Sequence, residues 1–257
     1  MTVLTTSAGR RAALLAVEGL SKRYGDRVVL DGFSLDVAAG EVVSLLGANG
    51  SGKSTALRCI AGLDRPDGGT VSAAGERTRL GTPIPSVAMV FQRIHLVPRR
   101  TALDNVCAGA LGRLGFRESW SSYAFPRALR EEAMACLDRV GLADRCHEKA
   151  GRLSGGQQQR VAIARALCQR ASVILADEPV SALDPAAADQ VMRLFRSLAD
   201  EDGMAIAAVL HQPDLAKKYS DRLVGLLRGV TAFDVHPDRL GERELEELYR
   251  PDMENES

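Results

Sequence analysis

The sequence predicts an α/β fold with a mostly parallel sheet, and three observations lead to this prediction. An apolar run at residues 41–46 leads into a glycine-rich loop, which a helical stretch over 54–62 follows. Two more apolar runs, 172–176 and 205–210, each come after a stretch with helical periodicity. Buried strands that alternate with helices form parallel sheets with the helices packed on them.

The beginning of the chain predicts a small antiparallel β-layer ahead of the parallel sheet. Residues 1–12 show no hydrophobic period and are predicted to be a flexible tail. Residues 14–24 and 28–37 then alternate around a turn at Gly25-Asp26, as the strands of a hairpin do.

The middle of the chain predicts helices. One face of the stretch 128–140 is apolar and the other is charged, which is typical of an amphipathic helix. The apolar face consists of Leu129, Ala133, Cys136, Leu137 and Val140.

The second half of the chain returns to strands that alternate with helices. A helix is predicted over 155–169, and another begins at Asp184, which can cap it, with Pro185 in its first position. Gly203 ends that helix. The remaining predicted elements are a helix at 213–219, a hairpin at 223–233 that turns at Arg228-Gly229, and a helix at 242–249.

Together these elements predict four parts of the chain. They are a flexible tail at 1–12, an α/β core at 13–92 and 153–235, an inserted helical subdomain at 93–152, and a C-terminal helix and tail at 236–257.

Composition excludes several classes of protein. The 257 residues include 33 basic and 33 acidic residues, so the chain lacks the basic surplus of a nucleic-acid binder, and no nucleic-acid partner is expected. No run approaches the roughly 18–20 apolar residues of a membrane span. The five cysteines are odd in number and scattered, as expected of a protein from a reducing compartment. We therefore expect a cytoplasmic protein whose membrane contacts are made through partners.

The loop after residue 46 fits G-x-x-x-x-G-K-[ST], the pattern of a phosphate-binding loop. Its glycines let backbone N–H groups turn inward around a phosphate, and Lys53 can reach the β- and γ-phosphates. The Ser54 hydroxyl can ligate Mg²⁺. A glycine-rich turn without a ligand is the alternative. The predicted nucleotide-binding residues are Gly47, Ala48, Asn49, Gly50, Ser51, Gly52, Lys53, Ser54 and Thr55.

Two carboxylates follow the apolar strand at 172–176. Asp177 is predicted to lie beside the Mg²⁺ held by Ser54, as a Walker B acid does. Successive strand residues point to opposite faces, so Glu178 has a different role and can hold the attacking water as general base. A pair of carboxyl groups that merely caps the next helix is the alternative.

The stretch at 153–157 offers a second anion site. Ser154, Gly155 and Gly156 open a helix, where N–H groups, a hydroxyl and the positive end of the helix dipole come together. One triphosphate already has a cradle in this chain, so a second copy must supply the other phosphate. With Leu153 before it and Gln157 after it, this stretch resembles the signature of the ATP-binding-cassette (ABC) ATPases.

The resemblance implies roles for four single residues. Tyr24 resembles the aromatic residue that stacks on adenine, and Gln92 the glutamine that reaches Mg²⁺ and the attacking water. His211 resembles the histidine that contacts the γ-phosphate, and Asp184 lies in the loop that crosses the dimer interface. Lys53 and Glu178 complete the predicted catalytic set with Gln92 and His211. The alternatives are a packed tyrosine, a solvated glutamine, a structural histidine and a plain helix cap.

The resemblance covers residues 14–249. Five regions are similar to phosphonate-import ATPases, namely 108–115, 120–126, 131–145, 153–167 and 210–222. The resemblance implies two copies that sandwich Mg·ATP at the cytoplasmic face of the inner membrane. It also implies integral membrane permease subunits and, indirectly, an extracytoplasmic binding protein. The open alternatives are an ABC subunit of a soluble phosphonate-degradation complex and an ABC ATPase that acts on nucleic acid or ribosomes.

Aromatic residues gather in the helical insertion, although the chain is only 4% aromatic. Exposed aromatic side chains near Gln92 would suit docking of a helix from the membrane partner. A satellite hydrophobic cluster is the alternative. The residues concerned are Phe116, Trp120, Tyr123 and Phe125.

Overall fold

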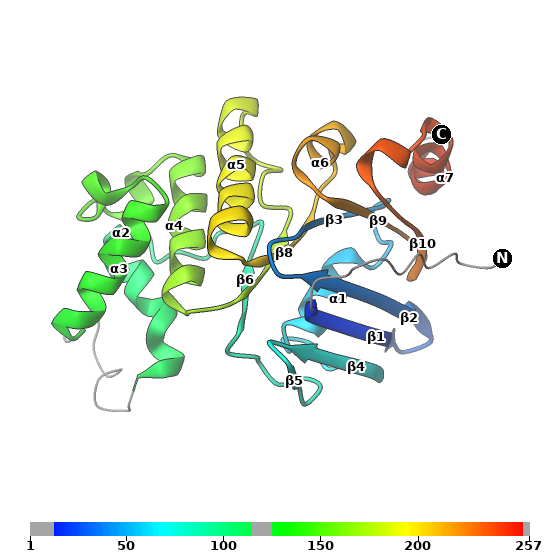
Figure 1. Ribbon diagram of the computed structural model, residues 1–257, viewed down its shortest axis with the longest axis horizontal. Helices are drawn as coiled ribbons and strands as arrows, with labels where there is room; N and C mark the ends of the chain where they lie inside the picture. Colours follow the sequence, from blue (N-terminus) through cyan, green and yellow to red (C-terminus); the bar gives the residue numbers. More distant parts are fainter. Residues whose placement is uncertain (1–12, 115–124, 254–257) are drawn as a thin grey trace.

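The computed structural model describes residues 13–114 and 125–253, which form two β-sheets with helices around them (Figure 1). A cluster of helices lies to one side of the mixed sheet in Figure 1, and the antiparallel sheet lies on the other side. No helix in these ranges has both the length and the apolar character that crossing a bilayer needs.

The larger sheet has six strands in the order β10-β9-β3-β8-β7-β6. All neighbouring pairs are parallel except β9 and β10, which form the predicted hairpin. Every residue of β3 and β8 is buried, which explains why their sequences contain only apolar residues apart from Ser44. The strands are β3 (Val42–Leu46), β6 (Val87–Val90), β7 (Val173–Asp177), β8 (Ala205–Val209), β9 (Arg222–Leu227) and β10 (Val230–Val235).

Parallel pairing fixes where the site lies. Strands β3, β7 and β8 end at the same edge of the sheet, with Asp177 opposite Val209 in the register of β7 and β8. The residues that follow these strands, Gly47, Glu178 and the segment 210–211, therefore meet at that edge. Ligands of parallel α/β sheets bind at the carboxyl ends of the strands.

The smaller sheet is antiparallel, with the order β2-β1-β4-β5. Its first hairpin turns at Gly25-Asp26 as predicted, so Tyr24 at the end of β1 pairs with Arg27 at the start of β2. A cluster of buried hydrophobic side chains lies between this antiparallel sheet, the larger sheet and helix α1 (Lys53–Ile60). The strands are β1 (Ala13–Tyr24), β2 (Arg27–Ala38), β4 (Gly68–Ala73) and β5 (Glu76–Arg77).

Helices α2 and α3 pack on α4 to form the helical cluster. The predicted helix at 128–140 is α3, whose residues Leu129, Ala133 and Leu137 are buried, while Cys136 is only half-buried. The elements here are α2 (Ala102–Cys107), the 3₁₀-helix η1 (Ala108–Arg113), α3 (Arg127–Arg139), η3 (Ala143–Arg145), η4 (Ala150–Arg152) and α4 (Gly155–Cys168).

The aromatic cluster of the insertion is only partly described. Phe116, Trp120 and Tyr123 lie outside the described residues. Phe125 is buried in the core with α3 residues such as Leu129, so it is not an exposed docking residue. Phe125 does not form a satellite cluster either, because it belongs to the large hydrophobic core that also contains residues of β3, α4 and α5.

Helix α5 (Pro185–Asp202) begins and ends as predicted. Asp184 caps it by accepting from two backbone N–H groups, and Gly203 ends it at a φ of 67°. The C-terminal elements are α6 (Pro213–Tyr219), η5 (Pro237–Arg239) and α7 (Glu242–Met253). Helix α7 is longer than the predicted helix at 242–249 and continues through Pro251, although proline disfavours the helical conformation of the residue before it.

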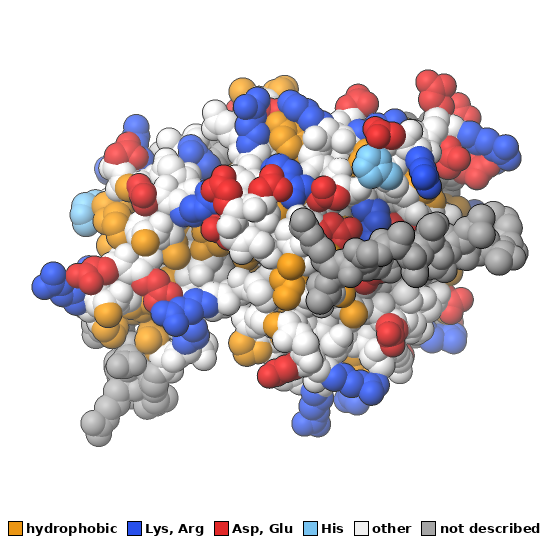
Figure 2. Space-filling model, viewed as in Figure 1, with side chains coloured by type: hydrophobic (Ala, Val, Ile, Leu, Met, Phe, Trp, Pro, Cys, Tyr) orange, Lys and Arg blue, Asp and Glu red, His pale blue; other side chains and the backbone are white. Residues whose placement is uncertain are grey.

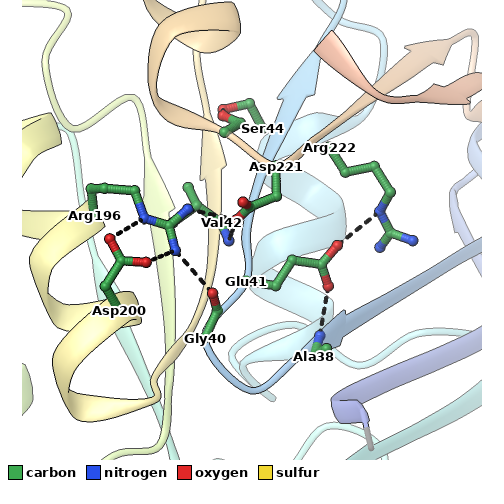
Figure 3. A network of polar contacts seen from close by, with 10 residues as sticks. Ala38, Gly40, Glu41, Val42, Ser44, Arg196, Asp200, Asp221 and Arg222 are labelled. Atoms are coloured by element: carbon green, nitrogen blue, oxygen red, sulfur yellow. Dashed lines mark hydrogen bonds and ion pairs between the residues drawn. The ribbon is translucent and has the colours of Figure 1, made fainter. Parts of the chain in front are cut away.

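A polar network ties α5 to the beginnings of β3 and β9 (Figure 3). Arg196 of α5 donates to Asp221 (2.6 Å) and to the backbone oxygen of Gly40 (2.9 Å). Asp221 also accepts from the backbone N–H of Val42 at 2.8 Å. This network fixes the end of β3 that lies away from the phosphate loop.

Candidate nucleotide-binding site

The phosphate loop connects β3 to α1, and two of its glycines have no room for a side chain. A Cβ on Gly47 would lie 2.4 Å from the backbone oxygen of Leu226. Gly52 has a φ of 109°, and its Cβ would lie 2.7 Å from the backbone oxygen of Val29. Only glycine fits at these positions, so the pattern in the sequence reflects the shape of the loop.

The loop contains a buried cation and a buried hydroxyl group that suit phosphate. Lys53 is 5% exposed, and its Nζ donates to the backbone oxygens of Gly47 (2.7 Å) and Ala48 (2.9 Å). The Oγ of Ser51 is buried and has no hydrogen-bond partner among the described residues. Burying a charge or an unpaired hydroxyl is costly without a compensating partner. Phosphate oxygens would supply that partner.

Ser54 and Asp177 meet as predicted. The Ser54 Oγ donates to Asp177 Oδ1 at 2.8 Å. Burial raises the pKa of Asp177, and the hydrogen bond from Ser54 only partly offsets this. A hydroxyl and a carboxylate are oxygen ligands of the kind that Mg²⁺ prefers. A cation between them would also compensate for the burial of the carboxylate, so the pair fits Mg²⁺.

Glu178 and His211 form a second pair at the same edge of the sheet. The Nε2 of His211 lies 2.7 Å from Oε1 of Glu178. Glu178 directly follows β7, and His211 is the second residue after β8. Glu178 has a φ of 51°, in the left-handed region that non-glycine residues rarely adopt. Such conformations cluster at functional sites because surrounding structure must hold them. Asp177 and Glu178 therefore have different partners, as the sequence predicted.

Lys53, Ser54 and Glu178 line one pocket of about 330 Å³, whose lining does not include Asp177 or His211. Tyr24 lies at its rim, 48% exposed, with its hydroxyl donating to Asp64 (3.0 Å) and Lys22 Nζ 4.7 Å from its ring centre. The pocket joins this aromatic ring to the phosphate loop and Glu178. It is lined by Tyr24, Arg27, Val29, Asn49, Gly50, Gly52, Lys53, Ser54, Thr55 and Glu178.

Sequence reasoning missed Arg27 and Val29 as pocket residues. Both lie on β2, and Arg27 pairs with Tyr24 across the hairpin turn. The predicted turn at Gly25-Asp26 was the available signal, because residues that flank a two-residue turn face each other.

The structure does not place Gln92 with Ser54 and Asp177. Gln92 is exposed and lines a separate pocket of about 240 Å³, together with Gln158 of α4. This pocket lies between the segment after β6 and the beginning of α4.

The segment at Ser154 starts α4 with a capping box. The Ser154 Oγ accepts from the Gln157 N–H (3.3 Å), and Gln157 Oε1 accepts from the Ser154 N–H (2.9 Å). The segment Ser154–Gly156 is not part of the lining of this chain's own phosphate-loop pocket. It is exposed or half-exposed at the end of a 14-residue helix.

The two signature glycines allow close packing against the segment that leads into α5. A Cβ on Gly155 would lie 3.2 Å from Leu183, and one on Gly156 would lie 3.0 Å from Ala187. Asp184, between these two neighbours, accepts from the backbone N–H groups of residues 186 and 187 at 3.1 and 2.9 Å. The signature segment and the Asp184 loop therefore form one packed unit.

Comparisons with known proteins agree with this geometry. The family model described as ABC transporter matches residues 30–181. The "Phosphonates import ATP-binding protein PhnC" of Frankia casuarinae is 48% identical, over 84% of this chain and 88% of that protein. The "Hypophosphite import ATP-binding protein HtxD" of Stutzerimonas stutzeri is 41% identical, over 92% of this chain and 71% of that protein.

Solved structures of ABC cassettes have the same fold. A nucleotide-free ATP-binding cassette from an ABC transporter is 26% identical with a TM-score of 0.80, covering 92% of this chain and 95% of that one. A dimeric cassette in a post-hydrolysis state with ADP and Pi is 31% identical with a TM-score of 0.70, covering 87% and 98%. The predicted fold class, a phosphate-loop α/β core with an antiparallel layer and a helical insertion, is confirmed.

A buried lysine in a glycine loop, a hydroxyl–carboxylate pair and a glutamate–histidine pair lie together at one edge of the six-stranded sheet. The family match and the relatives show that the chain belongs to the ABC transporter family as an ATP-binding, ATP-hydrolysing subunit.

Proposed function

We propose that this chain powers the uptake of a phosphonate or a related phosphorus oxyanion through a separate permease. The support comes from its relatives, which are named as import proteins for phosphonates and for hypophosphite. These compounds share a phosphorus oxyanion. In this proposal the chain binds and hydrolyses ATP to drive the permease, and a separate extracytoplasmic binding protein selects the substrate.

The working unit is proposed to be two copies of this chain that sandwich two Mg·ATP. The observation that supports it best is that Ser154, Gly155 and Gly156 present a helix N-terminus away from the chain's own pocket. Such an end binds anions through its free N–H groups and dipole. The partner copy's ATP is the anion that this proposal assigns to it, and the dimeric relative supports the arrangement.

In the proposed reaction, a water molecule attacks the γ-phosphorus and Glu178 accepts the proton from that water. The bond between the γ-phosphorus and the bridging oxygen breaks, and ADP leaves with that oxygen. Glu178 is bonded to His211 in this structure, so a γ-phosphate that accepts from His211 would free a Glu178 oxygen for the water. Lys53 and the loop N–H groups stabilise negative charge on the phosphates. Ser54 and Asp177 would hold Mg²⁺, which neutralises phosphate charge when bound. Gln92 would join them only after the segment following β6 moves.

The permease contact is proposed to lie next to Gln92. A groove of about 540 Å³ runs between the end of α1, the segment around β6 and helix η1, and Leu63, Met89 and Phe91 give it an apolar lining. A helix of an integral membrane partner would fit such a groove. The chain would then be peripheral at the cytoplasmic face of the inner membrane.

Basic and acidic side chains are interspersed on the face in Figure 2, without the broad basic surface that nucleic acid requires.

Glu178→Gln tests the proposed chemistry. The amide keeps the size of the side chain but cannot accept the proton, so we expect ATP binding and dimerisation with hydrolysis slowed by about 10²–10⁴. Rates would be measured on the complex with its permease, and dimerisation by light scattering. Wild-type hydrolysis by Glu178→Gln would show that the base lies elsewhere.

The substrate is tested by ATPase activity of the membrane complex, titrated with binding protein loaded with phosphonate, phosphite or phosphate. Stimulation by one loaded form identifies the oxyanion, and equal rates with all forms and with empty binding protein would contradict the proposal. Co-purification with soluble enzymes or nucleic acid in place of a membrane protein would favour the other classes.

A further inference from the structure

Arg27 lies in the nucleotide pocket, although no sequence motif marks it. It is the first residue of β2, directly opposite Tyr24 across the hairpin turn. It lines the pocket together with Tyr24 and Gly50. Its Nη2 lies 3.6 Å from the position that a Cβ on Gly50 would take, so the guanidinium reaches the phosphate loop itself.

The other polar groups around Tyr24 already have partners. Lys22 Nζ donates to the backbone oxygen of Arg65 at 2.7 Å and also lies over the Tyr24 ring. Asp64 accepts from the Tyr24 hydroxyl (3.0 Å) and from Arg58 (3.2 Å).

Arg27 differs from these neighbours. Within residues 13–114 and 125–253, no hydrogen bond or ion pair involves the Arg27 side chain. An arginine fork offers five N–H donors that match the geometry of a phosphate group. A guanidinium in a pocket, without a partner among the residues that the structure describes, is suited to a bound anion.

The position of Arg27 indicates which part of the nucleotide it contacts. Tyr24 marks the adenine end of the pocket, while Lys53 and Ser54 mark the end of the β- and γ-phosphates. Arg27 lies on the hairpin that carries Tyr24 and extends to Gly50 of the loop, so it lies between the two ends. The α-phosphate is the charged group of the nucleotide that lies between them.

We propose that Arg27 binds the α-phosphate of the nucleotide in cis, as a second cation beside Lys53. This inference rests on the proposed nucleotide site. The contact is shared by ATP and ADP, because both carry the α-phosphate. It therefore raises affinity for both nucleotides by the same factor and does not select the base.

The test uses the full chain and calorimetric binding of Mg·ADP, Mg·GDP and a non-hydrolysable ATP analogue with Mg²⁺. A hydrogen bond between charged groups strengthens binding most when it is desolvated, and less where the side chain is exposed to water. We therefore expect Arg27→Ala to raise the Kd of all three nucleotides by about tenfold, and Arg27→Lys to recover part of the loss. The loss should shrink at high salt.

Arg23→Ala is the matched control, because Arg23 is an exposed arginine on the same hairpin that does not line the pocket. Equal Kd values for Arg27→Ala and Arg23→Ala would overturn the inference. A loss confined to the ATP analogue would place the contact at the γ-phosphate, and a loss confined to adenine nucleotides would place it on the base; either result overturns it. Lys53→Ala tests the proposed nucleotide site separately from the Arg27 contact. If Lys53→Ala leaves nucleotide binding unchanged, the proposal that the nucleotide binds at the phosphate loop is wrong.

Discussion

Asp177→Asn separates magnesium binding from folding. The amide has nearly the same size as the carboxylate, and its oxygen can still accept the 2.8 Å hydrogen bond from Ser54. It removes a negative charge whose burial raises the pKa of Asp177. Without ligand, we therefore expect the variant to be as stable as the wild type or slightly more stable.

The loss should appear only when Mg²⁺ is present. A ligand at 100 times its Kd stabilises the folded state by about 2.7 kcal/mol. In a chain of this size each kcal/mol shifts the melting temperature by roughly 2–4 °C. The wild type should therefore gain roughly 5–10 °C from Mg·ADP. With weaker Mg²⁺ binding, Asp177→Asn should gain only the smaller shift produced by ADP in EDTA.

Differential scanning fluorimetry with ADP, with and without Mg²⁺, measures both shifts. Glu178→Gln is the matched control, because Glu178 faces His211 and not Ser54, and it should keep the full Mg²⁺-dependent shift. A full Mg²⁺-dependent shift in Asp177→Asn would refute the assignment of Asp177 as a ligand. Loss of the shift in Glu178→Gln alone would show that the two carboxylates have exchanged roles.

Three further predictions concern stability and reactivity. Asp184→Ala should lower the free energy of unfolding by about 1 kcal/mol, because α5 loses its cap; urea denaturation that matches wild type would contradict this. The pKa of Asp189 lies well below its usual 3.8, chiefly because Lys218 donates to it, so its stabilisation is present above about pH 4 and is lost as the pH falls below that. Asp189→Asn should flatten the pH dependence of the urea midpoint there, and an unchanged slope would count against it. Burial raises the pKa of the Cys59 and Cys107 thiols to about 11 and about 12, so iodoacetamide at about pH 8 should label them only after unfolding, as mass spectrometry would show.

The fold was predictable because its central strands are buried on both faces. The runs that became β3 and β8 contain almost only apolar residues, and glycine or a helix end marks their limits. The phosphate loop was predictable because its steric demands act on consecutive residues. Gly47 and Gly52 have no room for a Cβ, so the sequence itself records the constraint.

Other features depend on contacts between distant segments, which no local pattern records. Phe125 was predicted either to be exposed or to lie in a satellite cluster, but the main hydrophobic core buries it. Arg27 has no motif, and its place beside Gly50 follows from how the antiparallel sheet lies against the loop. The position of Gln92 likewise depends on the packing of the segment after β6 against α4.

The contact between the signature glycines and the segment before α5 has a consequence for the proposed pair of subunits. Gly155 touches the loop that follows the Glu178 of its own chain, while the same glycine would face the nucleotide bound by the other chain. A shift that brings α4 toward the neighbour's nucleotide must therefore carry the loop beside Glu178 with it. The two hydrolysis events of one transport cycle would then be mechanically coupled. Hydrolysis in one subunit would change the position of the loop beside Glu178 in the other subunit.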